Sequence, residues 1–244
     1  MSDKFKLGIM QPYFFPYLGY YDLINRTDHW IVFDVVKYTP KSWMNRNRIL
    51  HPTDGWQYIS TPVNKHAGDG LIKGVQILDV SAAHDKVRSQ IEHYRKGGAP
   101  HFPAVASLVD SCFSGLQGNL LRDLNVRSLT LVCGYLGITF NHTNLSEMSL
   151  ALPSIQHPGQ WALEITSALG ANAYLNPPGG RAIFRTDEWV DRGIDLDFTN
   201  LVSFVYPTRH YSFIEHLSII DVLMWNSPEM VKAYLDSRLA DSST

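Results

Sequence analysis

The sequence predicts an α/β fold in which a mostly parallel sheet is flanked by helices. Short apolar segments rich in Val, Ile and aromatic residues alternate with longer segments of helical periodicity. The 244 residues, 45% of them hydrophobic and 18% charged, can bury a large core. No internal repeat or low-complexity linker interrupts them, so we expect one domain over residues 1–238 and a flexible tail at 239–244.

The first elements are expected to form a strand, helix, strand unit. FKLGIM (5–10) and HWIVFDVV (29–36) have the composition of buried strands, and PYLGYYDLINRT (16–27) that of a helix. Such a unit forms a right-handed crossover between parallel strands. The turn QPYFFPYLG (11–19) then lies at the carboxyl end of the sheet, where open α/β folds bind ligands.

The later elements follow from the same patterns. We expect a hairpin or an extra strand pair from GWQYISTPV and LIKGVQIL, then helices over 82–95, 104–113 and 120–137, and a strand over 138–144. A helix ending at Gly170, a strand AYL, a strand over 194–202 and terminal helices over 212–235 complete the chain. These elements predict a Rossmann-like or nucleotidyltransferase-like core with a helical C-terminal half.

Composition and charge exclude several classes of function. The 21 cations and 23 anions give a net charge of -2, so no global basic field binds nucleic acid. The first twelve residues contain no signal-peptide apolar region, and no apolar segment is long enough to span a membrane. The two cysteines, Cys112 and Cys133, form no CxxC pair and are expected in the core. We therefore expect a cytoplasmic protein.

Two neighbouring segments carry the main candidate site. In the first turn, Gln11, Tyr13 and Tyr17 offer polar groups, and Gly19 permits close backbone approach at a helix start. Four cations and no acid lie between Lys37 and Arg48, where the site candidates are Tyr38, Lys41, Trp43, Asn45, Arg46 and Asn47. Asp34, at the end of the second strand, is a further candidate. Arginine and lysine at a strand end suit a phosphate or carboxylate ligand. The alternatives are core aromatics and a solvated loop.

Two further segments give weaker signals. Tyr174 opens YLNPPGG, whose glycines can present backbone amides to an anion, although no phosphate-binding motif occurs there. The C-terminal segment contains His216, Ser218 and Asp221 without the spacing of a zinc site or the motif of a serine nucleophile. We expect no metal site and no Ser-His-Asp triad.

Several segments together resemble the WbqC-like protein family. They are QPYFFPYLGYYDLI, DHWIVFDVVKYTPKSWMNRNRI, TPVNK, EHYRKGGAPHF, LGANAYLNPPGG and LSIIDVLMWNSPE, in this order over nearly the whole chain. The resemblance implies a role in bacterial surface-polysaccharide (O-antigen) or other specialised-sugar biosynthesis, and for some members a glycine transferase activity. It adds Lys65, in TPVNK, to the substrate-binding candidates.

The resulting hypothesis is a transferase that attaches an amino-acyl group to an amino sugar or small amine. Asp34, Lys41 and Arg46 are the catalytic candidates; the other site candidates bind substrate. The sequence specifies no cofactor. By analogy with nucleotidyltransferase-type enzymes, the candidate is ATP, which would activate the carboxylate of the amino-acyl donor. The base is left open between Asp34 and the histidines. The expected partners are small molecules and pathway enzymes. The alternative is a non-catalytic protein that binds a sugar or nucleotide-sugar.

Overall fold

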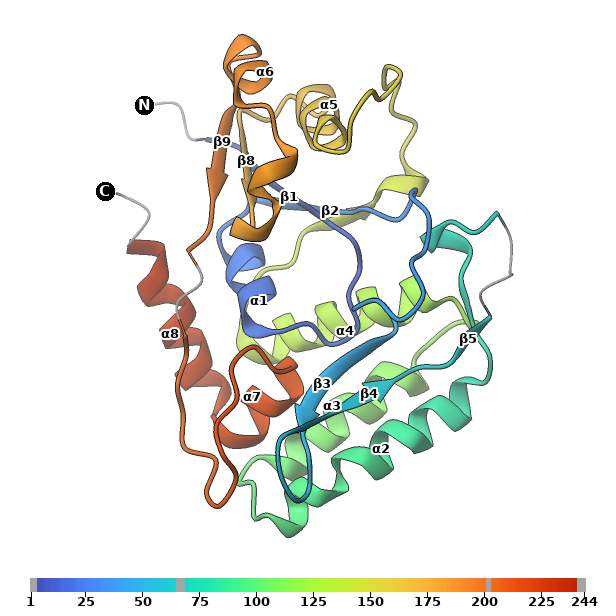
Figure 1. The fold of residues 1–244 in the computed structure, drawn as a ribbon, viewed down its shortest axis with the longest axis vertical. Helices are drawn as coiled ribbons and strands as arrows, with labels where there is room; N and C mark the ends of the chain where they lie inside the picture. Colours follow the sequence, from blue (N-terminus) through green and yellow to red (C-terminus); the bar gives the residue numbers. More distant parts are fainter. Residues whose placement is uncertain (1–3, 65–68, 201–202, 241–244) are drawn as a thin grey trace.

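The computed structural model describes residues 4–64, 69–200 and 203–240, and these form an α/β fold (Figure 1). Its main sheet has five strands in the order β7-β2-β1-β8-β9, and every neighbouring pair is parallel. The strands are β1 (Lys6–Met10), β2 (His29–Val32), β7 (His142–Asn144), β8 (Ala173–Asn176) and β9 (Asp195–Phe198). Numbered along the chain this order is 3-2-1-4-5, the doubly wound Rossmann-type arrangement. The predicted fold class is confirmed.

Alternating side chains give the sheet two buried faces. On β2, Trp30 and Val32 pack into one core with helix α1 (Leu18–Asn25). Ile31 points to the opposite face and joins Leu7 and Ile9 against α5 (Gln160–Ala168) and α6 (Thr186–Asp191). This period-2 alternation explains why the strands are apolar throughout.

A long insertion between β2 and β7 builds the second half of the molecule. It contains an antiparallel hairpin, β3 (Arg46–Leu50) with β4 (Trp56–Ser60), and a short antiparallel pair, β5 (Val63–Asn64) with β6 (Gln76–Ile77). The helices α2 (Val80–Lys96), α3 (Phe102–Ser114) and α4 (Leu121–Leu136) complete it. In Figure 1, α4 lies nearest the sheet and α2 lies farthest from it.

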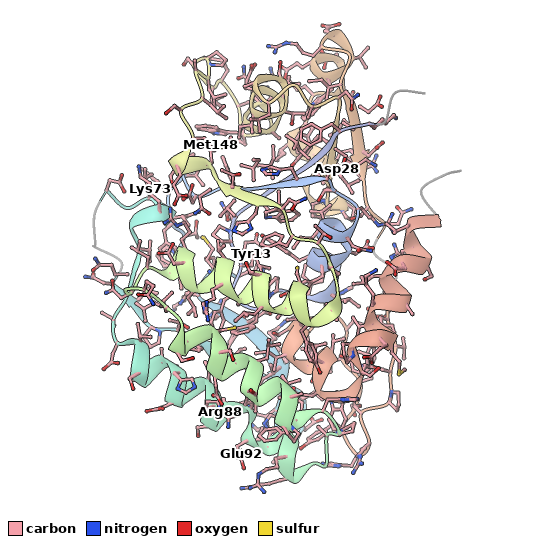
Figure 2. The ribbon with its side chains drawn as sticks, turned by 180° about the vertical axis from the view of Figure 1, so that it is seen from behind. Tyr13, Asp28, Lys73, Arg88, Glu92 and Met148 are labelled. Atoms are coloured by element: carbon pink, nitrogen blue, oxygen red, sulfur yellow. The ribbon has the colours of Figure 1, made fainter. Side chains whose placement is uncertain are left out.

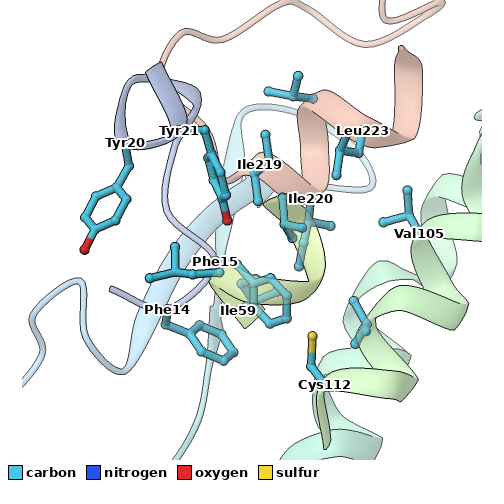
Figure 3. Packing of buried hydrophobic residues seen from close by; sticks show 14 of the residues in the cluster. Phe14, Phe15, Tyr20, Tyr21, Ile59, Val105, Cys112, Ile219, Ile220 and Leu223 are labelled. Atoms are coloured by element: carbon cyan, nitrogen blue, oxygen red, sulfur yellow. The ribbon is translucent and has the colours of Figure 1, made fainter. Parts of the chain in front are cut away.

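The chain ends on helices α7 (Ile219–Trp225) and α8 (Pro228–Ala240). Ile219, Ile220 and Leu223 of α7 meet Phe15 of the first turn and Val105 of α3 in the larger core (Figure 3). The same core holds both cysteines as free, buried thiols, as expected, and burial raises the pKa of Cys112 to about 12. No helix in the described part of the chain is long and apolar enough to cross a bilayer.

The structure differs from the sequence prediction at several elements. The terminal helices, expected from residue 212, begin at Ile219, and the strands expected over 138–144 and 194–202 are only His142–Asn144 and Asp195–Phe198. The segment around Asn47, expected as a loop, is strand β3. The strand expected over 29–36 ends at Val32, and the one over 71–78 is a 3-10 turn (Ile72–Gly74) followed by β6. Helix α6 was not predicted. Of the expected tail, residues 241–244 lie outside the described residues, as does Lys65.

Candidate ligand-binding site

A cavity of about 590 Å³ opens at the carboxyl ends of β1 and β8. The strand order reverses between these two strands, and doubly wound sheets bind their ligands at this point. The volume is within the range of about 300–1,000 Å³ usual for small-molecule sites. The walls are largely apolar and aromatic, from Ile9, Phe33, Trp43, Trp161, Tyr174, Ile183 and Phe184, and the polar groups come from Gln11, Tyr13, Tyr17, Asn47, Arg48, Asn176 and His216.

The first turn forms one wall, and its backbone is strained. Phe15 has a φ of 40°, a conformation that costs an L residue about 1–3 kcal/mol. Side chains distant in the sequence hold the turn in place. Asn47 Nδ2 donates to the carbonyls of Phe14 (3.1 Å) and Phe15 (2.8 Å), and Ser218 Oγ donates to Phe15 (2.7 Å). The β3 strand and the start of α7 therefore fix where Gln11, Tyr13 and Tyr17 lie.

The tyrosines of the turn are neutral hydrogen-bonding groups. Burial raises the pKa of both Tyr13 and Tyr17 above the ordinary value. Tyr13 lies in the middle of the molecule (Figure 2) and its ring centroid is 5.6 Å from that of Tyr20. Tyr17 meets the His216 ring edge-on at 5.8 Å. Gln11 makes no side-chain hydrogen bond with any described residue, so its amide is available to a ligand.

The YLNPPGG segment forms the opposite wall. Tyr174 is buried, stacks on Trp189 and donates its hydroxyl hydrogen to Asn176 Oδ1 at 2.8 Å. Asn176 Nδ2 in turn donates to the Pro177 carbonyl at 2.9 Å. A Cβ on Gly180 would lie 2.1 Å from that Nδ2 atom, so glycine leaves the space that the Asn176 side chain occupies. The second glycine of this turn therefore has a packing role.

Arg48 and His216 are cavity residues that the sequence analysis did not select. Arg48 Nη2 donates to the His216 carbonyl at 3.4 Å, so the two residues lie on the same rim. His216 has a φ of 57° and a side chain 44% exposed. The described lining contains no aspartate or glutamate. Arg48 could have been selected from the sequence because it belongs to the basic segment that ends there. No sequence motif marks His216 as a cavity residue.

Ser218 and Asp221 of the C-terminal segment are engaged in structural hydrogen bonds. Ser218 Oγ is bonded to the Phe15 carbonyl, and Asp221 is fully buried. The Asp221 carboxylate accepts hydrogen bonds from Tyr94 (2.5 Å) and Tyr206 (2.6 Å). The described residues also contain no cluster of His, Cys, Asp and Glu able to hold a metal ion.

Of the candidate site residues, the cavity brings together Gln11, Tyr13, Tyr17, Trp43, Asn47 and Tyr174. Asp34 lies outside its lining. The Asp34 carboxylate is buried and accepts from Ser146 N (2.9 Å), Ser146 Oγ (2.6 Å) and Arg122 Nη1 (3.0 Å). Asp34 thus ties the end of β2 to α4 and to the segment after β7.

The other candidates lie around the cavity rather than in it. Lys41 is exposed with a φ of 59°, and Arg46 stacks on Tyr58. Asn45 Nδ2 donates to the Thr61 carbonyl at 3.3 Å, while Tyr38 is half-buried and burial raises its pKa to about 12. Gly19 lines a separate hollow of about 40 Å³, which shares Tyr17 with the main cavity.

The fold and this cavity define a doubly wound α/β protein with a cavity at its switch point. The chain belongs to the WbqC-like protein family, which matches residues 11–233. It is also similar to "Uncharacterized protein Rv1507c" of Mycobacterium tuberculosis (strain ATCC 25618 / H37Rv), with 32% identity over 183 residues, covering 72% of this chain and 74% of that protein. No solved structure matches the chain.

Proposed function

We propose that the protein is a cytoplasmic transferase that joins an amino-acyl group, of the glycine type, to the amine of an amino sugar or related small amine. The observation that carries the proposal is the cavity of about 590 Å³ at the point where the strand order reverses. Membership of the WbqC-like family supports it.

The cavity chemistry suits a sugar ring and an acyl donor. Aromatic walls such as Trp43 and Trp161 match the apolar faces of a pyranose, and the amide of Gln11 matches its hydroxyls. Arg48 is the cation of the cavity lining that would bind an anionic group of a substrate. These groups line one cavity, where bound reactants would be held close together.

His216 is the group best placed to accept a proton. It lines the cavity, and a neutral imidazole nitrogen can act as a general base. In the proposed step the amine attacks the acyl carbonyl, and a C–N bond forms while the C–O bond of an acyl phosphate or the C–S bond of a thioester breaks. His216 takes the proton that the amine loses. ATP is the proposed activating co-substrate; a coenzyme A thioester is the other donor to test.

The test is amide formation by the purified chain. Glycine with ATP, or glycyl-coenzyme A, is incubated with amino sugars and their nucleotide-linked forms, and the product is detected by mass spectrometry. His216→Ala should lower the rate at least about a hundredfold, as expected for loss of a general base. His210→Ala is the matched control, since His210 is exposed and lies outside the cavity lining. Equal rates in the two variants would refute the role of His216, and no product from either donor would refute the transferase.

A second candidate function is retention of a sugar intermediate without turnover. The specific observation in its favour is the predominance of aromatic rings and amides over ionisable groups in the cavity lining. Amino-sugar binding by the wild-type chain without product would support this function instead of the transferase.

A further inference from the structure

The outer face of the β3–β4 hairpin carries a row of guanidinium and aromatic groups that begins at the cavity. Side chains alternate between the two faces of a strand, so Arg46 and Arg48 lie on one face, opposite to buried Asn47 and Ile49. Across the hairpin, Arg48 is paired with Tyr58. We call this row the arginine–aromatic face; it consists of Trp43, Arg46, Arg48, Trp56 and Tyr58.

The members of this face stack on one another. The guanidinium carbon of Arg46 is 4.1 Å from the centre of the Tyr58 ring. The guanidinium carbon of Arg48 is 5.3 Å from the centre of the Trp56 ring and 5.5 Å from the centre of the Trp43 ring. The rings of Trp56 and Tyr58 meet edge-on at 4.9 Å. Stacking holds both guanidinium groups in place and leaves their N–H edges for other partners.

The two arginines lack the carboxylate partners that other arginines of this chain have. Arg88 pairs with Asp110 and Arg122 with Asp34, whereas neither Arg46 nor Arg48 forms an ion pair with any described residue. In addition, Arg48 Nε is buried without a hydrogen-bond partner in the described part of the chain. Two positive charges are therefore fixed, unneutralised, at the mouth of the cavity of a protein whose net charge is -2.

The spacing of these charges indicates the class of ligand. Residues two apart on a strand are about 7 Å apart, close enough for neighbouring phosphates of one diphosphate to meet one guanidinium each. Exposed rings beside them, such as Trp56 (41% exposed), can stack on a nucleobase. We propose that the arginine–aromatic face binds the nucleoside diphosphate of a nucleotide-linked sugar, whose sugar enters the cavity. This subsite rests on the proposed function, because it identifies the form in which the acceptor arrives.

The experiment is calorimetric titration of the full chain with UDP, dTDP, GDP and ADP, each compared with its monophosphate, without metal. We expect at least one diphosphate to bind about tenfold or more tightly than its monophosphate. Arg46→Ala should weaken that diphosphate about tenfold and remove most of its preference over the monophosphate. Arg95→Ala is the control, since Arg95 is exposed and pairs with Glu92 on its own helix.

Three results would overturn the subsite: equal binding of di- and monophosphates, unchanged diphosphate affinity in Arg46→Ala, or binding of ATP with Mg²⁺ but of no diphosphate. Failure of the subsite and failure of the transferase are distinguishable. Amide formation on a free amino sugar, with no diphosphate binding, would refute the subsite alone. If a diphosphate binds and Arg46→Ala weakens its binding, but no amide is formed, the subsite would be supported and the transferase refuted.

Discussion

Asn47 uses its side chain to hold the first turn, although it also lines the cavity. Its amide nitrogen serves two carbonyls of the strained turn, and its Oδ1 accepts from the backbone N–H of Arg48 at 2.8 Å. Asn45, two residues earlier, makes a single longer bond to Thr61 and leaves its Oδ1 buried without a partner. Asn45 and Asn47, two residues apart, are therefore expected to contribute very differently to the free energy of unfolding.

Asn47→Ala should destabilise the protein by about 2–4 kcal/mol, because it leaves two carbonyls of a strained turn without their donor. Asn45→Ala, the matched control, should cost less than about 1 kcal/mol. Urea unfolding followed by circular dichroism measures both. Similar losses in the two variants would contradict the assigned role of Asn47.

Asp221 should make stability depend on pH. Burial raises its pKa from 3.8 to about 6, so the folded state binds this proton more tightly than the unfolded chain. The resulting stabilisation is complete below about pH 4 and is lost as pH rises through 6. Relative to Asp221→Asn, the wild type should lose about 2 kcal/mol of unfolding free energy between pH 4.5 and 7.5. A constant difference between the two proteins over this range would refute the pKa shift.

At the scale of elements, the pairing of β1 with β2 and the position of the first turn could be predicted, because apolar strands around an amphipathic helix have few alternative arrangements. Strand β3 could not be recognised by composition, since Arg and Asn have low strand propensity and the hairpin faces solvent on one side. Its signal was the period-2 alternation of Arg46 and Arg48 with Asn47 and Ile49. Strand β2 ends two residues before Asp34, whose carboxylate is bonded to Ser146 and Arg122.

The residues of the cavity lining could be predicted where strand order places them. They could not be predicted where contacts between residues distant in the sequence place them. The turn after β1 and Tyr174 after β8 follow from strand order. The segment that carries His216 is held against the first turn and β3 by contacts between residues distant in the sequence. These include Ser218 Oγ to the Phe15 carbonyl and the Ser218 N–H to the Arg48 carbonyl, and no local pattern encodes them. The roles of all the candidate residues, in the cavity or beside it, stay predictions.

The YLNPPGG turn provides a test at this scale. Gly180→Ala should lower the melting temperature by about 3–6 °C and displace Asn176, because the new Cβ would meet its side chain. Gly179→Ala is the control: a Cβ there meets nothing within 4 Å, and we expect a change of less than about 2 °C. Thermal unfolding by calorimetry distinguishes the two, and a melting temperature unchanged in Gly180→Ala would contradict the packing role.

For the whole molecule, Asp34 and Arg122 connect the sheet to the helical insertion. Arg122 lies on α4, and its side chain is 12% exposed while that of Asp34 is fully buried. The pair joins two parts of the chain that are 88 residues apart in the sequence. Its loss should therefore affect global stability.

Arg122→Met should cost about 3–5 kcal/mol, because it leaves the buried Asp34 charge without its cation. The double variant Asp34→Asn/Arg122→Met should recover part of this loss, since no buried charge remains. Chemical denaturation of the wild type, both single variants and the double variant measures the coupling. Additive losses would refute the pairing.

If amide formation is found, its loss in a stably folded Asp34→Asn variant would support the predicted catalytic role of Asp34.

The most direct test of the account is whether closing the switch-point cavity abolishes ligand binding. Gly179 lines the cavity next to open space, so Gly179→Trp should fill the cavity while leaving the fold intact. The measurement is the melting temperature with and without UDP-glucosamine, which is one nucleotide-linked amino sugar of the proposed class. We predict a rise for the wild type, corresponding to about 2.7 kcal/mol at a ligand concentration one hundred times Kd, and none for Gly179→Trp. An equal rise in both proteins, or no rise in the wild type, would contradict the account.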